Sequence, residues 1–209
     1  TPAMLTATAP QPVAPVRRVA PADVRLVAIG ASTGGIEALH KLLPSFPANC
    51  PPTLLVQHIN PTFAGPMAEM LDAKCQARVK LAEPGEALAY GTIYVAPGSE
   101  RHLTVSNNGR LAVKLAAAEK VSGHRPSVDM LFRSVAETVG SSAVGIILTG
   151  MGCDGALGLG EMRRAGAYTL AQDEATCTVY GMPRAAVERG AADTVLPIGR
   201  IAQAALGLA

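Results

Sequence analysis

Short apolar runs alternate along this chain with longer segments in which apolar residues recur every three or four positions. Runs rich in Val, Ile and Leu predict strands, and the longer period predicts helices. The predicted strands are 24–30, 53–57, 92–95, 143–148 and 167–172, and the predicted helices are 35–43, 63–74, 128–139, 156–165 and 182–188. This alternation predicts an α/β fold with a doubly wound, mostly parallel sheet and helices on both faces.

Two segments depart from this alternation. Residues 101–115 form two alternating runs around Asn107-Asn108-Gly109, which predicts an antiparallel hairpin, and we expect it at one edge of the sheet. Residues 1–22 are rich in Ala, Pro and Thr, which is typical of a linker. The sequence therefore predicts a linker over 1–22 and one folded domain over 23–209.

Composition narrows the classes of function. The net charge is only +2 among 209 residues, and Trp is absent, so neither a basic nor a stacking surface for nucleic acid is expected. No apolar run reaches the roughly 18 residues of a membrane span, so no membrane insertion is expected. The four cysteines lack metal-binding spacing, and no signal peptide precedes them. We therefore expect reduced thiols in a cytoplasmic protein, with no metal and no cofactor.

The sequence Gly30-Ala31-Ser32-Thr33-Gly34-Gly35 follows the first predicted strand and opens the first predicted helix. A serine on a glycine-rich turn between a strand and a helix is how several folds expose a nucleophilic hydroxyl. The helix N-terminus behind Ser32 would supply N–H groups and a positive dipole end to a developing oxyanion. A phosphate-binding turn, or a turn without chemistry, is the alternative.

Partners for Ser32 are expected at the same edge of the sheet, because ligands of open parallel sheets bind beyond the carboxyl ends of the strands. His58 directly follows the second predicted strand, Asp154 lies in the loop after 143–148, and Asp173 and Glu174 follow 167–172. A hydroxyl, an imidazole and a carboxylate form the set used in nucleophilic hydrolysis. Spacing does not separate Asp154 from Asp173, and Asp154 could equally be a helix N-cap.

Other histidines fit this chemistry less well. His40 lies on a predicted helix, where a structural role is expected, His102 lies in the hairpin, and His124 could line a rim. Because the order is Ser, His, Asp, the chain is not a standard α/β hydrolase, in which His comes last.

Two other functions compete with hydrolysis. A dinucleotide-binding domain would use the same turn, but its middle glycine and the ribose-binding acid are missing. A non-catalytic protein-binding module would be indifferent to loss of the Ser32 hydroxyl.

Several blocks of the chain, taken in order, resemble the catalytic domain of the chemotaxis protein-glutamate methylesterases (CheB). They are AIGASTGG at 28–35, QHINPTF at 57–63, IYVAPG at 93–98, HRPSVDMLF at 124–132, ILTGMGCDGALG at 147–158 and AQDEATCTVYGMPRAA at 171–186. The resemblance implies that Ser32 is the nucleophile, His58 the general base and Asp154 the acid. It also implies an oxyanion region near the backbone of Thr33 and Met151. Cys153 departs from the pattern, since Asn is expected there.

The resemblance further implies a serine hydrolase that removes methyl groups from glutamyl γ-methyl esters of chemoreceptors and deamidates receptor glutamines. The implied partners are methylated chemoreceptor cytoplasmic helices and a receiver domain in the parent protein. Candidate rim charges for acidic receptor helices are Arg101, His102, Arg125, Arg163, Arg164 and Arg184.

Overall fold

The computed structural model describes residues 23–98 and 100–208, and within them the main sheet has seven parallel strands. Their spatial order is β3-β4-β2-β1-β7-β8-β9. The strands are β1 (Leu26–Ala31), β2 (Thr53–Gln57), β3 (Arg78–Leu81), β4 (Thr92–Val95), β7 (Ala143–Ile147), β8 (Tyr168–Gln172) and β9 (Thr194–Leu196). The central strands are buried along their whole length, as expected for a parallel sheet covered on both faces.

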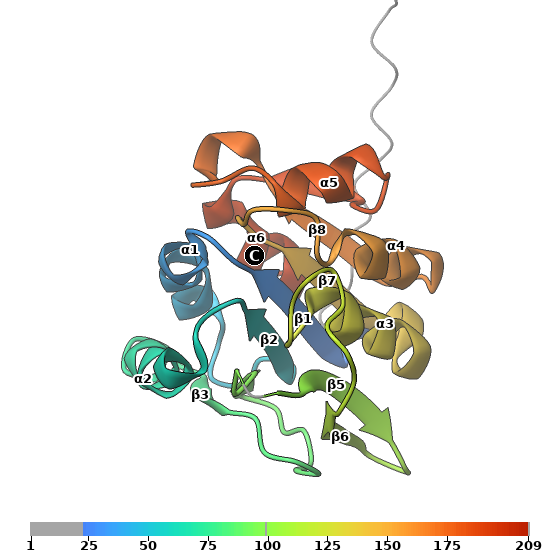
Figure 1. The fold of residues 1–209 in the computed structure, drawn as a ribbon. Coiled ribbons are helices and arrows are strands. Elements are labelled where there is room, and N and C mark those ends of the chain that lie inside the picture. The colour runs from blue at the N-terminus through green and yellow to red at the C-terminus, as the bar shows by residue number, and fades with distance from the viewer. Residues whose placement is uncertain (1–22, 99, 209) are drawn as a thin grey trace, which may run out of the picture.

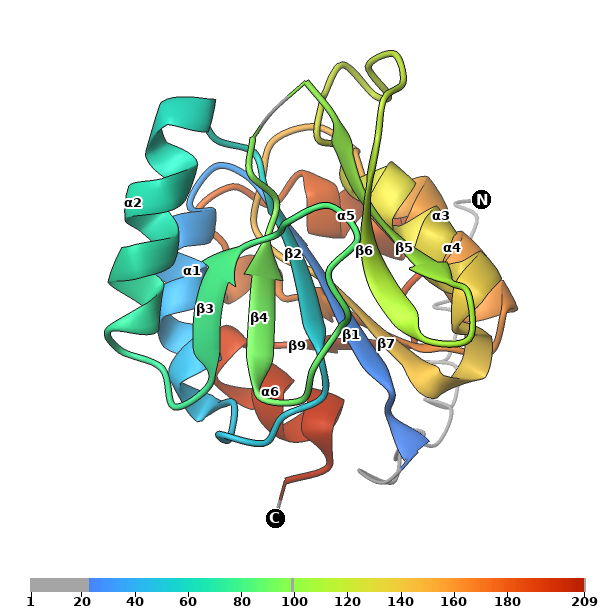
Figure 2. The same cartoon turned by 90° about the horizontal axis from the view of Figure 1, so that it is seen from below.

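Helices cover both faces of this sheet (Figures 1 and 2). One face carries α1 (Gly35–Leu42), α2 (Pro61–Asp72) and α6 (Ile198–Leu206), and the other carries α3 (Val128–Thr138), α4 (Ala156–Arg164) and α5 (Met182–Glu188). Short 3-10 turns, η2 (Leu43–Ser45), η3 (Gly140–Ser142) and η4 (Glu174–Thr176), join some of these elements. Successive side chains of β1 point to opposite faces of the sheet. Val27 and Ile29 are buried in the core on the α1 side, and Leu26 and Ala28 are buried in the core on the α3 side. The predicted doubly wound α/β architecture is confirmed.

The predicted hairpin forms, but it is not an edge of the main sheet. Strands β5 (His102–Asn107) and β6 (Leu111–Ala116) make a two-stranded antiparallel sheet of their own. Leu103 and Val105 are buried in the core that also contains α3, and the Val105 N–H donates to Ser134 Oγ of α3 at 3.1 Å. Packing against a helix therefore takes the place of pairing with the parallel sheet.

The edges of the main sheet are β3 and β9, which the sequence prediction lacks, as it lacks α6. Both strands are short, at four and three residues, and neither is completely buried, so their apolar runs are weak.

The order of the strands creates a switch point between β1 and β7. From β1 the chain first builds toward β2, and it returns through α3 to place β7 on the other side of β1. The helices that come after these two strands lie on opposite faces, and in open α/β sheets ligands bind at the carboxyl ends of such a strand pair. The predicted linker over 1–22 lies outside the described residues. No helix in the described part of the chain is long and apolar enough to cross a membrane.

Candidate active site

The turn that carries Ser32 is fixed by backbone and side-chain hydrogen bonds. The Ser32 N–H donates to the Thr149 carbonyl at 3.0 Å, and the Ser32 carbonyl accepts from the Gly35 N–H and from Gln57 Nε2, both at 2.8 Å. A Cβ on Gly35 would lie 2.0 Å from Gln57 Oε1, and Gly34 has a φ of 78°, so both glycines are required here. Ser32 itself is half-buried, which leaves its side chain accessible.

His58 is held beside Ser32 by the pairing of β1 with β2. Ala31 and Gln57 are register partners, and the His58 N–H donates to the Ala31 carbonyl at 2.9 Å. The two side chains therefore come directly after paired positions on neighbouring strands. The His58 side chain is only 8% exposed, and its Nε2 lies 2.8 Å from Asp154 Oδ2. Its Nδ1 is buried without a partner, and no hydrogen bond joins it to the Ser32 hydroxyl among the described residues.

The Asp154 carboxylate accepts four hydrogen bonds, three of them from the start of α3. Oδ1 accepts from Ser127 Oγ at 2.7 Å and from the Asp129 N–H at 3.0 Å, and Oδ2 accepts from the Val128 N–H at 2.8 Å as well as from His58. The side chain is 1% exposed. Burial alone would raise the pKa of Asp154, but the hydrogen bonds from His58 and from the start of α3 hold it below its ordinary value.

These contacts determine which His58 nitrogen can accept a proton. An ionised carboxylate only accepts hydrogen bonds, so His58 Nε2 carries the proton that is shared with Asp154. In the neutral imidazole, Nδ1 then has a free lone pair. The arrangement can therefore accept a proton at His58 Nδ1, on the side of the ring away from the carboxylate.

The loops with Thr33 and Met151 flank Ser32. A Cβ on Gly150 would lie 2.7 Å from the Cβ of Ser32, so the β7 loop packs directly against the serine. Thr149 Oγ1 donates to the Thr33 carbonyl at 2.9 Å and ties the two loops together. Within residues 23–98 and 100–208, the hydrogen bonds include no acceptor for the N–H of Thr33 or of Met151. Both residues are exposed.

The second carboxylate that the sequence left open has another role. Asp173 Oδ1 accepts from the Thr176 N–H at 3.0 Å and caps η4, and none of its hydrogen bonds reaches His58. Its neighbour Glu174 is exposed in the same turn. The structure thus joins His58 to Asp154 and leaves Asp173 outside the cluster.

Three of the predicted rim charges are wrong. His102 is completely buried, where its Nδ1 accepts from the Ser127 N–H at 3.1 Å and its Nε2 donates to the Glu119 carbonyl at 2.9 Å. Arg163 and Arg164 occupy the last turn of α4, whose first turn comes directly after the site loop. The helix runs back along the sheet, so these arginines lie at the end away from Ser32.

Three residues outside the predicted triad take part in this cluster. Gln57 Nε2 donates to the carbonyls of both Ser32 and His58, at 2.8 and 3.0 Å. Ser127 caps α3 and donates to Asp154, and the His124 ring stacks on the ring of His58. Gln57 directly precedes His58 in the sequence, and the other two share the block 124–132, but nothing in either block indicates these contacts.

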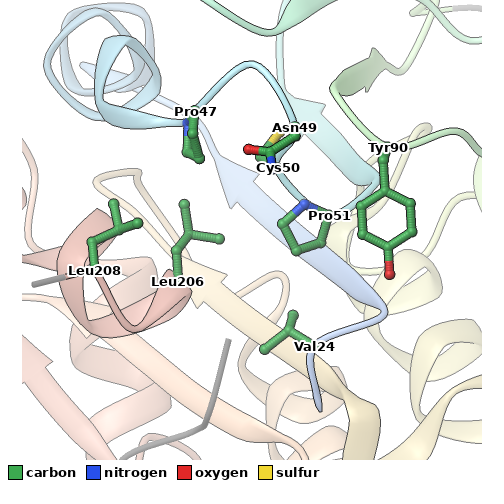
Figure 3. A pocket seen from close by; sticks show the side chains of 8 residues that line it. All are labelled: Val24, Pro47, Asn49, Cys50, Pro51, Tyr90, Leu206 and Leu208. Atoms are coloured by element: carbon green, nitrogen blue, oxygen red, sulfur yellow. The ribbon is translucent and has the colours of Figure 1, made fainter. Parts of the chain in front are cut away.

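A cavity of about 530 Å³ opens at the other end of the sheet (Figure 3). Its lining is mostly apolar and comprises Val24, Pro47, Asn49, Cys50, Pro51, Tyr90, Leu206 and Leu208. Val24 and Pro51 precede the first residues of β1 and β2, so the cavity is separated from Ser32 by the length of these strands. Burial raises the pKa of the Cys50 thiol to about 11, which leaves it unreactive at neutral pH.

Comparison with known families decides what kind of domain this is. The sequence profile of the family described as CheB methylesterase matches residues 27–205. The chain belongs to the CheB methylesterase family. Membership favours the hydrolase interpretation of the Ser32 turn over the dinucleotide-binding one.

Individual CheB relatives match most of this chain. A protein of Agrobacterium fabrum named protein-glutamate methylesterase/protein-glutamine glutaminase is 53% identical over 203 residues, which cover 97% of this chain and 57% of that protein. A Rhizobium johnstonii protein with the same name and the suffix 1 is 54% identical over 197 residues, which cover 90% and 57% of the two chains. The chain therefore spans little more than half the length of these relatives.

A solved CheB structure shares the fold. The crystal structure of the Thermotoga maritima CheB methylesterase catalytic domain aligns with a TM-score of 0.85 and 38% sequence identity. The alignment covers 89% of this chain and 99% of that one. The described part of the chain thus corresponds to a CheB catalytic domain.

Proposed function

We propose that this chain is a serine hydrolase that removes methyl groups from glutamyl γ-methyl esters of chemoreceptors and deamidates receptor glutamines. The observation that carries the proposal is the 2.8 Å hydrogen bond between His58 Nε2 and Asp154 Oδ2, at the strand ends next to Ser32, in a chain of the CheB family. The names of the Agrobacterium and Rhizobium relatives supply both substrates, the glutamate methyl ester and the glutamine amide.

In the proposed reaction, Ser32 Oγ attacks the ester carbonyl while His58 Nδ1 accepts the hydroxyl proton. Asp154 holds His58 in the required tautomer and stabilises the imidazolium. The tetrahedral intermediate collapses, and His58 Nδ1 returns the proton to the departing methoxide, which leaves as methanol. Water, activated by the same nitrogen, then hydrolyses the acyl-enzyme to free glutamate and Ser32. An amide substrate reacts by the same path and releases ammonia.

The oxyanion requires donors that are not already engaged. The N–H groups of Thr33 and Met151 meet this condition and flank Ser32, so we assign them this role. One such donor lowers the barrier by about 2.7–4 kcal/mol. The reaction as proposed needs neither a metal nor a cofactor, because the nucleophile, the base and the electrostatic stabilisation all come from the chain.

The proposed substrate also defines the partners and the place of the reaction. The esterified side chains lie on cytoplasmic helices of the receptors, so we propose that the enzyme acts in the cytoplasm. Arg101, Arg125 and Arg184 remain candidates for contacts with acidic receptor helices. A receiver domain in the parent protein stays a proposal that rests on the family resemblance.

Methanol release from methylated chemoreceptor membranes tests this function. The wild-type protein is compared with Ser32→Ala and with Ser45→Ala, a matched control in which an exposed hydroxyl of η2 is removed. We expect release by the wild type and by Ser45→Ala and none by Ser32→Ala. Release by Ser32→Ala would remove Ser32 from the mechanism, and no release by any of the three would refute the methylesterase activity.

A further inference from the structure

The imidazole of His58 has a second neighbour besides Asp154. The rings of His58 and His124 are stacked, with centroids 3.7 Å apart and planes inclined by 6°. His124 is half-buried and comes from the segment before α3, a part of the chain distant in sequence from His58. The acyl-transfer steps above use no atom of His124, so the stack needs a separate explanation.

The turn that carries His124 is built to hold this ring in place. Val121 and His124 exchange two backbone hydrogen bonds of 3.1 and 2.9 Å around Ser122 and Gly123, which have φ angles of 52° and 81°. Ser122 Oγ donates to Asp129 Oδ2 at 3.1 Å. Because the N–H of Asp129 also binds Asp154, one residue links the turn to the carboxylate that holds His58.

A single hydrogen bond at Nε2 fixes one corner of an imidazole and leaves the plane of the ring free to rotate. The proposed reaction requires Nδ1 to face the Ser32 hydroxyl, so rotation of the His58 ring would misalign the base. A flat neighbour in parallel contact removes this freedom, since rotation of one ring would drive its edge into the face of the other. The stack is also suited to the charge that His58 acquires, because a cation is attracted to the face of an aromatic ring.

We propose that His124 is a positioning residue, whose ring fixes the plane of His58 so that Nδ1 faces Ser32. This inference rests on the proposed function, since it assigns His58 Nδ1 as the base. His124 itself exchanges no proton in the reaction. The flat face of the His124 ring is what restrains His58. Among the described residues, no hydrogen bond to the ring nitrogens of His124 is present.

Burial is the main reason that the His124 ring stays neutral. The titratable groups whose charges act on its pKa are His58, which it contacts, Asp154 and Lys120. Burial lowers the pKa of His124, the proximity of His58 and Lys120 lowers it further, and Asp154 opposes them. At neutral pH His124 therefore presents a neutral face to His58 and does not repel the imidazolium.

Two substitutions separate the flat face from mere bulk. His124→Phe keeps an aromatic ring but no ring nitrogen, and His124→Leu fills space without a flat face. We expect kcat of His124→Phe to stay within about threefold of wild type, and that of His124→Leu to fall roughly tenfold with KM little changed. The free energy of unfolding of both variants, measured in urea, identifies any loss of folded protein.

Equal kcat values for the Phe and Leu variants would overturn the proposal, whether both match the wild type or both are equally low. A loss confined to KM would also overturn it, because misplacement of the base acts on the chemical step.

A second readout does not depend on the natural substrate. The rate at which a fluorophosphonate labels Ser32 requires an aligned base, and we expect the Phe variant to be labelled faster than the Leu variant. If the wild type releases no methanol but is labelled, the proposed function fails, and the order of the labelling rates still decides the role of His124.

Discussion

Replacing Asp154 by Asn tests the chemistry and the folding role of this carboxylate in one variant. The amide keeps one acceptor oxygen and replaces the other by a donor. If the oxygen takes the place of Oδ1, it retains Ser127 Oγ and the Asp129 N–H. The new NH₂ then faces His58 Nε2 and the Val128 N–H, both of which now donate to Oδ2. Each of these two contacts becomes a conflict between donors.

The conflict at His58 acts on catalysis. His58 can relieve it only by moving its proton from Nε2 to Nδ1, which removes the lone pair that is meant to accept the Ser32 proton. The corresponding exchange in a Ser-His-Asp triad lowers kcat roughly 10⁴-fold, and we expect a loss of that order. The conflict at Val128 acts on stability, because a buried N–H without an acceptor costs about 1–3 kcal/mol.

The pH dependence of this stability difference is set by the pKa of Asp154, which is lower in the folded state than its unfolded value of about 3.9. The carboxylate stabilises the fold fully above the unfolded pKa, and this contribution is lost as the pH falls through the folded pKa. The stability gap between wild type and Asp154→Asn should therefore be complete at neutral pH and narrow below about pH 4.

Urea unfolding followed by circular dichroism, at neutral pH and below about pH 4, measures this stability gap. Ester hydrolysis at neutral pH measures kcat. Asp173→Asn is the matched control, since it alters the other strand-end carboxylate, which caps η4. A variant at position 154 that keeps more than a tenth of wild-type kcat would refute the assigned role. So would a stability gap that widens as the pH falls.

Three further substitutions probe the surroundings of this cluster. Gly35→Ala should lower the free energy of unfolding by roughly 1–3 kcal/mol and should lower kcat, because the new methyl group would displace Gln57. An unchanged unfolding free energy together with an unchanged kcat would contradict this reasoning. Ser127→Ala should cost about 1 kcal/mol in urea unfolding through loss of the cap and of a donor to Asp154, and Ser127→Thr should restore part of it. Cys153→Asn should change kcat less than about threefold and stability by less than about 0.5 kcal/mol, since the Cys153 side chain is exposed and Asp154 already has all its donors.

The sequence could predict those features that depend on a single strand and the loop after it. Ser32, His58 and Asp154 each come after a strongly apolar strand, and parallel strands bring their carboxyl ends to one edge. Pattern alone did not separate Asp154 from Asp173, because the difference lies in the donors offered by the start of α3. That start belongs to another part of the chain, and only folding brings it to the carboxylate.

The wrong predictions also concern contacts between distant parts of the chain. Nothing in the alternation of 101–115 indicates that its apolar face packs on α3 rather than extending the main sheet. For the same reason His102, placed on the rim by sequence, is buried under the segment that leads into α3. The stack of His124 on His58 depends on a turn whose position is set by Asp129.

Because Asp154 also accepts hydrogen bonds from the start of α3, its proposed role as the acid would place it under two kinds of selection. A descendant that lost Ser32 would lose its chemistry without disturbing the packing of α3 against the β7 loop. Loss of Asp154 would instead leave the N–H groups of Val128 and Asp129 buried without an acceptor. Inactive members of such a lineage should therefore keep the aspartate long after the serine has drifted, so retention of the acid is a poor marker of activity and retention of the serine a good one.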